Sequence, residues 1–226
     1  MTTNTSPSPR PFPWTNWSID ATSSNEPLNF NTSALPNPVT AIGSPFDDTI
    51  KGTAFADFLG GGAGNDNFLG FTPGDTVNGD GGTDTIKLFT FADLAALNAA
   101  KDAEIVGVEV IDASGVADAV TVVIDLTKQT EGFQIIGTGE TDSIIGSKGD
   151  DITNGGAGND TLDGGKANDS VDAGEGDDLL FGGDGNDTLL GNLGNDSVAG
   201  GDGKDVINGG AGGDSIDGGD AEDQKC

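Results

Sequence analysis

The sequence predicts an all-β fold: a solenoid of short strands and tight turns, with one short helix in a bridging segment. Three observations support this prediction. Aspartate recurs every nine residues in two blocks of unbroken register. A glycine usually opens each nonapeptide, and a large apolar residue usually follows two places after the aspartate. A short fixed period indicates a solenoid, because each repeat buries its apolar residue only by stacking on its neighbours.

The clearest repeats are GGAGNDNFL (61–69), GGAGNDTLD (155–163) and GGDGNDTLL (182–190), in which the aspartate occupies place six. Glycines at places one, two and four are expected to let the backbone adopt positive φ and turn tightly. They also leave room for main-chain carbonyls to face a cation, to which the aspartate adds an anionic oxygen. The residue at place eight should begin a strand and point inward, while places seven and nine point outward. The expected inward residues are Ile50, Leu59, Phe68, Val77, Ile86, Leu162, Val171, Leu180, Leu189, Val198, Ile207 and Ile216.

This nonapeptide pattern, GGxGxDxUx with U a large apolar residue, resembles that of the RTX family of calcium-binding repeat proteins. The resemblance covers residues 43–87 and 137–226 and implies a parallel β-roll with two nonapeptides per coil. Turns from alternate repeats would then stack in two columns with Ca²⁺ between neighbouring turns. The resemblance implies at most eight calcium sites in the second block and three in the first.

The candidate calcium ligands are the repeat aspartates and the turns that contain the glycines of places two and four. The aspartates are Asp48, Asp57, Asp66, Asp75, Asp84, Asp142, Asp151, Asp160, Asp169, Asp178, Asp187, Asp196, Asp205, Asp214 and Asp223. The glycines are Gly62, Gly64, Gly156, Gly158, Gly183, Gly185, Gly201, Gly203, Gly210 and Gly212. Gly-Asn-Asp clusters also form ordinary turns, so a metal-free solenoid is the alternative. The formal net charge of −29 favours calcium, because stacked carboxylates repel one another without a cation.

Four segments are expected. Residues 1–42, rich in Pro, Ser, Thr and Asn, are either a flexible leader or a segment that docks on a solenoid end through Trp14 and Trp17. Residues 43–87 are the first β-roll block and residues 137–226 the second. Between them, residues 88–136 combine a helix over 91–101 with β-rich runs, which indicate either solenoid coils without calcium turns or a small α+β domain.

The amino-acid composition limits which functions are possible. The chain has no histidine, which removes a Ser-His-Asp triad and a histidine-rich zinc motif, so we expect no enzyme. The acidity argues against nucleic-acid partners and for cations. The single cysteine, Cys226, excludes an internal disulfide, and no stretch reaches transmembrane length. Neither a signal peptide nor a separate C-terminal secretion segment is visible, so the export route stays open.

The preferred hypothesis is a secreted, calcium-dependent structural protein that self-associates into an extracellular layer, sheath or fibre. A calcium-stabilised adhesin or carbohydrate-binding module is the alternative. Ice binding is disfavoured, because the outward residues at place seven do not form a regular threonine array. Calcium ions and further copies of the chain are the expected partners, at the cell surface or outside the cell.

Overall fold

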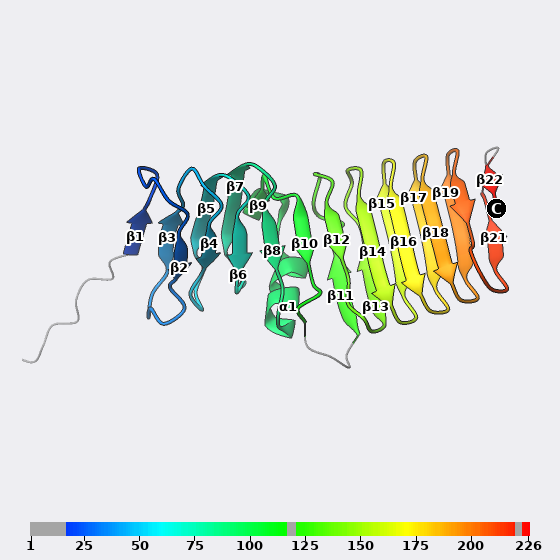
Figure 1. Ribbon diagram of the computed structural model, residues 1–226, viewed down its shortest axis with the longest axis horizontal. Helices are drawn as coiled ribbons and strands as arrows, with labels where there is room; N and C mark the ends of the chain where they lie inside the picture. The colour runs from blue at the N-terminus through cyan, green and yellow to red at the C-terminus, as the bar shows by residue number, and fades with distance from the viewer. Residues whose placement is uncertain (1–16, 117–120, 220–222) are drawn as a thin grey trace, which may run out of the picture.

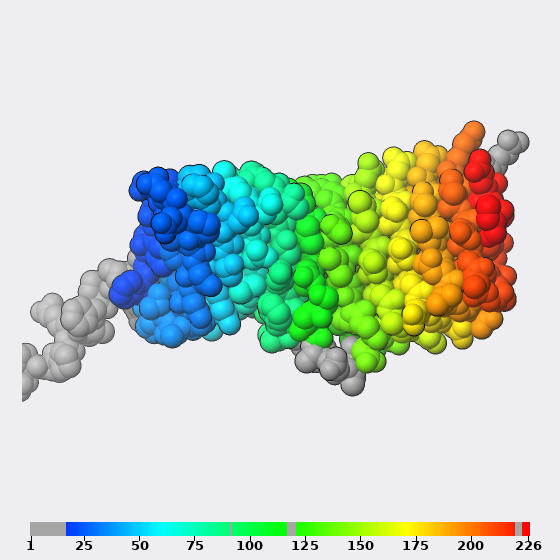
Figure 2. Space-filling model, viewed as in Figure 1, coloured from blue at the N-terminus to red at the C-terminus, as the bar shows by residue number. Residues whose placement is uncertain are grey.

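The chain forms one row of stacked β-coils that runs from the N-terminal to the C-terminal end of the molecule (Figure 1). The computed structural model describes residues 17–116, 121–219 and 223–226. Successive coils follow one another as bands along the surface (Figure 2), so residues that are distant in sequence meet only when they belong to neighbouring coils. Trp14 lies outside the described residues.

The even-numbered strands form a single eleven-stranded sheet along one face. All the strand pairs are parallel, as a solenoid requires, since each coil returns in the same direction. The strands of this eleven-stranded sheet are β2 (Asn29–Asn31), β4 (Thr49–Lys51), β6 (Asn67–Leu69), β8 (Thr85–Lys87), β10 (Val110–Asp112), β12 (Gln134–Ile136), β14 (Ile152–Ala157), β16 (Ser170–Glu175), β18 (Thr188–Leu193), β20 (Val206–Asn208) and β22 (Gln224–Lys225).

The odd-numbered strands form two further parallel sheets on the opposite face. The five-stranded sheet contains β1 (Trp17–Asp20), β3 (Val39–Ile42), β5 (Phe58–Ala63), β7 (Thr76–Gly81) and β9 (Ile105–Val106). The six-stranded sheet contains β11 (Val122–Asp125), β13 (Asp142–Ile145), β15 (Thr161–Lys166), β17 (Leu179–Asp184), β19 (Ser197–Asp202) and β21 (Ser215–Asp217).

The pairing register confirms that two nonapeptides make one coil. Leu162 pairs with Leu180, and Leu180 pairs with Val198, each eighteen residues on. Because the spacing is an even number of residues, every coil directs the same places inward. The place-eight residues predicted to face inward are buried, except Ile216 on β21, which is partly buried against the core.

The bridging segment interrupts one face and not the other. Helix α1 (Phe91–Ala99) lies where the five-stranded sheet ends and the six-stranded sheet begins (Figure 1). A capping box between Thr90 and Asp93 starts the helix, which ends two residues before the predicted limit. A short 3₁₀ turn (Asp102–Glu104) follows it. On the other face, β10 and β12 carry the eleven-stranded sheet through residues 88–136 without a break.

Helix α1 also contacts the first strand of the six-stranded sheet. The Asn98 side chain donates from Nδ2 to the Val123 carbonyl at 2.8 Å and accepts the Asp125 N–H at Oδ1 at 2.9 Å. These two bonds satisfy backbone groups on the edge of β11 that lacks a neighbouring strand. The helix therefore covers the free edge of β11, where the six-stranded sheet begins.

The described part of the N-terminal segment, residues 17–42, belongs to the solenoid. It supplies β1, β2 and β3, and Ile19, Phe30 and Leu35 pack against the core. Trp17 stays 51% exposed at the N-terminal end of the stack. The boundaries of the four predicted segments remain a prediction. Within the described ranges, no helix is long and apolar enough to cross a membrane.

Candidate metal centre

The repeat aspartates stack in the two predicted columns, and each carboxylate contacts the coil before it. Asp160 accepts the backbone N–H of Asp142 at 2.8 Å, and Asp178 accepts that of Asp160 at 2.8 Å. In the other column, Asp187 accepts the N–H of Asp169 at 2.8 Å. The same bond, from N–H to Oδ1 eighteen residues on, recurs through both blocks. One carboxylate oxygen of each of these aspartates, Oδ1, therefore forms a hydrogen bond that holds adjacent coils in register.

The second carboxylate oxygen, Oδ2, is buried without a hydrogen-bond partner in eight of these aspartates. Their side chains are 0–3% exposed. An ionised oxygen buried without a partner is strongly disfavoured, so such an atom indicates a missing ligand or proton. The eight residues are Asp66, Asp84, Asp160, Asp169, Asp178, Asp187, Asp196 and Asp205. We call the turns that contain them open turns.

The glycine at place one makes space for oxygens. A Cβ on Gly164 would lie 2.6 Å from Asp169 Oδ2 and 2.6 Å from the Gly182 carbonyl oxygen of the next coil. A carboxylate oxygen and a main-chain carbonyl thus converge on the gap between adjacent turns, where a side chain would block them. These are the hard oxygen ligands that calcium prefers.

The prediction that place one adopts positive φ is wrong except at Gly70, whose φ is +67°. The glycines at places two and four do so, with φ of +105° at Gly183 and +147° at Gly185, as do all ten candidate glycines. Gly182, at place one, lies outside this region. It is glycine because a Cβ would strike the carboxylate and the neighbouring coil, which is a steric requirement of the stack and not a backbone requirement of the turn.

Four other turns hold their aspartate entirely with protein donors. In the second block, the Ser147 N–H donates to Asp151 Oδ2 at 2.6 Å, and the Thr138 N–H donates to Asp142 Oδ2 at 2.6 Å. The Thr138 hydroxyl also donates to Asp142 Oδ1 at 2.9 Å. In the first block, Ser44 and Thr53 hold Asp48 and Asp57 in the same way. We call these four the start turns, because each is the first turn of its column.

A comparison with known protein families agrees with this geometry. The model of the RTX calcium-binding nonapeptide repeat matches residues 42–70, 134–162, 154–189, 163–198 and 190–224, which together make up more than half of the chain. The chain belongs to the RTX calcium-binding nonapeptide repeat family. No curated protein matches it.

RTX repeats bind calcium, and the residues of the open turns fit that ion. Among the described residues, no three Asp, Glu, His or Cys side chains assemble into one cluster. A calcium ion in this roll would therefore be held by a carboxylate together with main-chain carbonyls of adjacent coils, such as that of Gly182. When bound, calcium supplies positive charge to the buried Oδ2 atoms. The chain supplies the oxygen ligands, the register and the exclusion of water.

Burial raises the pKa of seven open-turn aspartates, which are Asp66, Asp84, Asp160, Asp169, Asp178, Asp187 and Asp196. Desolvation is the main cause, opposed by the backbone hydrogen bond that each carboxylate accepts. The pKa rises to about 7 for Asp160 and Asp169, and to about 6 for Asp66, Asp84 and Asp187. Neighbouring carboxylates of the same column add to the increase. Without a cation, these seven carboxyls therefore bind a proton more tightly than an exposed aspartate does.

Two features of the RTX turns were not predicted. At place five, Asn186 N donates to Asn168 Oδ1 at 2.9 Å, and Lys204 N donates to Asn186 Oδ1 at 2.9 Å, so a second series of bonds joins the coils. The asparagine that precedes many of the repeat aspartates was the available signal. Glu109, in the bridging segment, continues a column by accepting the Asp84 N–H at 2.8 Å. Its spacing breaks the period, so the sequence alone does not reveal it.

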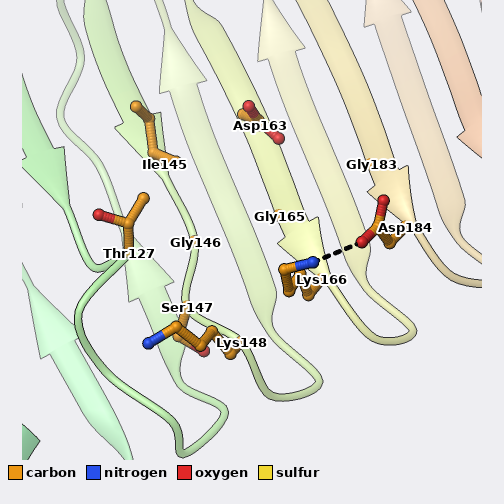
Figure 3. A pocket seen from close by; sticks show the side chains of 10 residues that line it. All are labelled: Thr127, Ile145, Gly146, Ser147, Lys148, Asp163, Gly165, Lys166, Gly183 and Asp184. Atoms are coloured by element: carbon orange, nitrogen blue, oxygen red, sulfur yellow. Dashed lines mark hydrogen bonds and ion pairs between the residues drawn. The ribbon is translucent and has the colours of Figure 1, made fainter.

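A shallow depression of about 340 Å³ borders the turns of the six-stranded sheet (Figure 3). Lys148 and Lys166 line it, and Lys166 pairs with Asp184 at 2.6 Å. Both partners of this ion pair are exposed, and it joins adjacent coils across the sheet. Such pairs add little to stability.

Proposed function

We propose that this chain is a non-enzymatic structural protein that folds on binding several calcium ions outside the cell or at its surface, and then self-associates. The observation that carries the proposal is the set of eight buried carboxylate oxygens without partners. The repeat aspartates would supply the anionic ligands, and carbonyls of the glycine turns the neutral ones. Extracellular calcium concentrations suit a protein whose fold depends on many such sites.

Calcium binding to sites absent from the unfolded chain contributes directly to folding. At neutral pH, the buried carboxylates favour the unfolded chain, in which they are hydrated. A cation in each gap removes that cost. We therefore propose that the roll folds where calcium is abundant and unfolds where calcium is scarce.

Self-association is supported by the ends of the stack. Within the described residues, β1 and β2 pair on one side only, as do β21 and β22 at the other end. An unpaired strand edge is a template for another chain. Trp17 on β1 adds a large exposed apolar side chain of the kind that dominates interfaces. End-to-end stacking of rolls is therefore the proposed mode.

Sedimentation velocity of the full chain in millimolar calcium and in chelator tests the proposal, with circular dichroism on the same samples. In chelator we expect monomers whose second block is unfolded, and in calcium we expect fully folded, higher-order species. Trp17→Ala should weaken assembly, whereas the matched change Ile152→Ala, at an exposed strand residue in the middle of the eleven-stranded sheet, should not. A folded monomer at high concentration would favour the adhesin or carbohydrate-binding alternative.

A further inference from the structure

The residue at place two divides the RTX turns of this chain into two backbone classes. In every open turn, place two is left-handed: Gly156 has φ of +115°, and the non-glycine residues Asp80 and Asn192 have φ of +67° and +71°. In the start turns, place two is Ser or Thr and lies outside the left-handed region. The two classes therefore differ in the backbone conformation at place two and not simply in whether that residue is glycine, since Asp80 and Asn192 also have positive φ.

The difference in backbone decides where the place-two N–H points. In the start turns it donates to the Asp carboxylate, at 2.6 Å for Ser147 and Asp151. In the open turns, the equivalent Oδ2 has no donor. The hydroxyl supports the start-turn geometry by also accepting the N–H at place four, as in the 3.1 Å bond from Gly149 N to Ser147 Oγ. Ser and Thr hydroxyls favour such local turns.

The start turns occupy equivalent positions in the fold. Each lies where a repeat block follows coils without the repeat, and its aspartate accepts an N–H from that preceding segment. Asp151 Oδ1 accepts from Phe133 at 2.7 Å, Asp48 Oδ1 from Leu28 at 2.6 Å and Asp57 Oδ1 from Val39 at 2.8 Å. The carboxylates at these positions are buried with protein donors at both oxygens, which is what a calcium ion would otherwise provide.

We propose that the start turns containing Ser44, Thr53, Thr138 and Ser147 are closed by protein hydrogen bonds and bind no calcium through their aspartates. The open turns alone take the ion. This inference rests on the proposed calcium sites and sets their number and limits. The second block then holds six ions and the first block two, in the gaps led by the eight open-turn aspartates. The start turns join each calcium column to metal-free coils and keep their geometry without the ion.

The experiment counts calcium bound per full-length chain by equilibrium dialysis in saturating calcium. For the natural chain we expect about eight ions, one for each open turn, against about twelve if the four start turns also bound one each. The variant Asp142→Ala/Asp151→Ala should keep the natural count, although its thermal stability falls. The matched variant Asp160→Ala/Asp169→Ala, one coil later in each column, should lose two ions.

A second variant converts start turns into open ones. Thr138→Gly/Ser147→Gly should gain two ions, because glycine lets place two become left-handed and withdraws the donor. The control Thr161→Gly/Ser197→Gly changes exposed strand residues and should leave the count unchanged. Loss of two ions in Asp142→Ala/Asp151→Ala, or about twelve ions in the natural chain, would overturn the inference and leave the proposed function intact. A natural chain that binds no calcium would overturn both.

Discussion

The first repeat block, residues 43–87, and the second, residues 137–226, share one nonapeptide but satisfy their aspartates differently. In the first block, three of five aspartates have protein donors at Oδ2: Asp48, Asp57 and Asp75, the last through the Thr72 N–H at 2.7 Å. In the second block, six of ten have a buried Oδ2 without a partner. One repeat pattern therefore produces a block closed largely by its own hydrogen bonds and a block in which most of the aspartates have a carboxylate oxygen without a donor.

The cores of the two regions differ in the same direction. Around the first block and the bridge, the buried apolar residues include Phe71 and the α1 residues Leu94 and Leu97 in addition to place-eight side chains such as Phe68. In the second block, the buried apolar residues are mostly the single place-eight side chain of each strand. Apolar burial contributes about 25 cal/mol per Å², so the N-terminal region carries more stability that is independent of calcium.

Calcium removal should have the largest effect. In chelator at neutral pH, we expect residues 155–219 to lose their structure while residues 17–116 keep most of theirs. The reason is that the open turns of the second block have no other source of positive charge, whereas the first region has the larger core. Hydrogen exchange resolved by segment, with and without calcium, measures this. Equal protection of both segments in chelator would remove the contrast between the blocks.

Asp187→Ala and Asp57→Ala should separate a ligand from a hydrogen-bond acceptor. Asp187 lies in an open turn, so its loss should raise the calcium midpoint of folding several-fold. Asp57 lies in a start turn, and its loss should leave the midpoint almost unchanged. Asp187→Ala leaves the buried N–H of Asp169 without its acceptor, and Asp57→Ala leaves those of Val39 and Thr53. Each such group costs about 1–3 kcal/mol of unfolding free energy. Calcium titrations followed by circular dichroism, with thermal unfolding in saturating calcium, distinguish the two effects.

Acid should partly replace calcium in the second block. The pKa of Asp160 and Asp169 is about 7 in the folded chain, above the ordinary 3.8, and that of Asp187 is about 6. A raised pKa means that protons bind the folded state more tightly, so this contribution to stability is present near pH 4 and is lost as the pH rises through 6 to 7. The calcium-free chain should gain β-structure as the pH falls from 7.5 to 5.

The calcium midpoint should rise over the same pH range, because protons compete for the same oxygens. Circular dichroism at a series of pH values, in chelator and in calcium, measures both trends. A calcium-free spectrum that does not change between pH 7.5 and 5 would show that the carboxylates are not buried as the structure has them.

Thr153→Val should have the smallest effect, and it should be stabilising. Thr153 occupies place eight of a start-turn repeat, is 2% exposed, and has a hydroxyl without a partner. Replacing that hydroxyl with a methyl group removes a buried polar atom and keeps the shape, which should add about 1 kcal/mol to the unfolding free energy. The control Thr161→Val, at an exposed place, should be near neutral. Chemical unfolding in saturating calcium measures both variants. A Thr153→Val variant no more stable than the natural chain would contradict the prediction.

The sequence by itself determined the repeat, its phase and therefore much of the fold. The nine-residue pattern predicted the inward residues such as Leu180, because side chains alternate along a strand. The resemblance to the RTX family implied the two-repeat coil and, with it, the stacking of Asp160 on Asp178. The helix near residue 91 also followed from local pattern and its cap. These features depend on short-range chemistry repeated many times.

Only the tertiary structure decided how each carboxylate is satisfied. Asp142 and Asp160 are equivalent in the repeat, yet one has protein donors at both oxygens and the other has a buried oxygen without a partner. That difference depends on the backbone turn at place two and on which coil lies beside it. The role of Glu109 likewise required the folded chain, since an insertion brings it into the column outside the period. Register follows from periodicity, whereas the satisfaction of a buried charge depends on neighbours that only packing brings together.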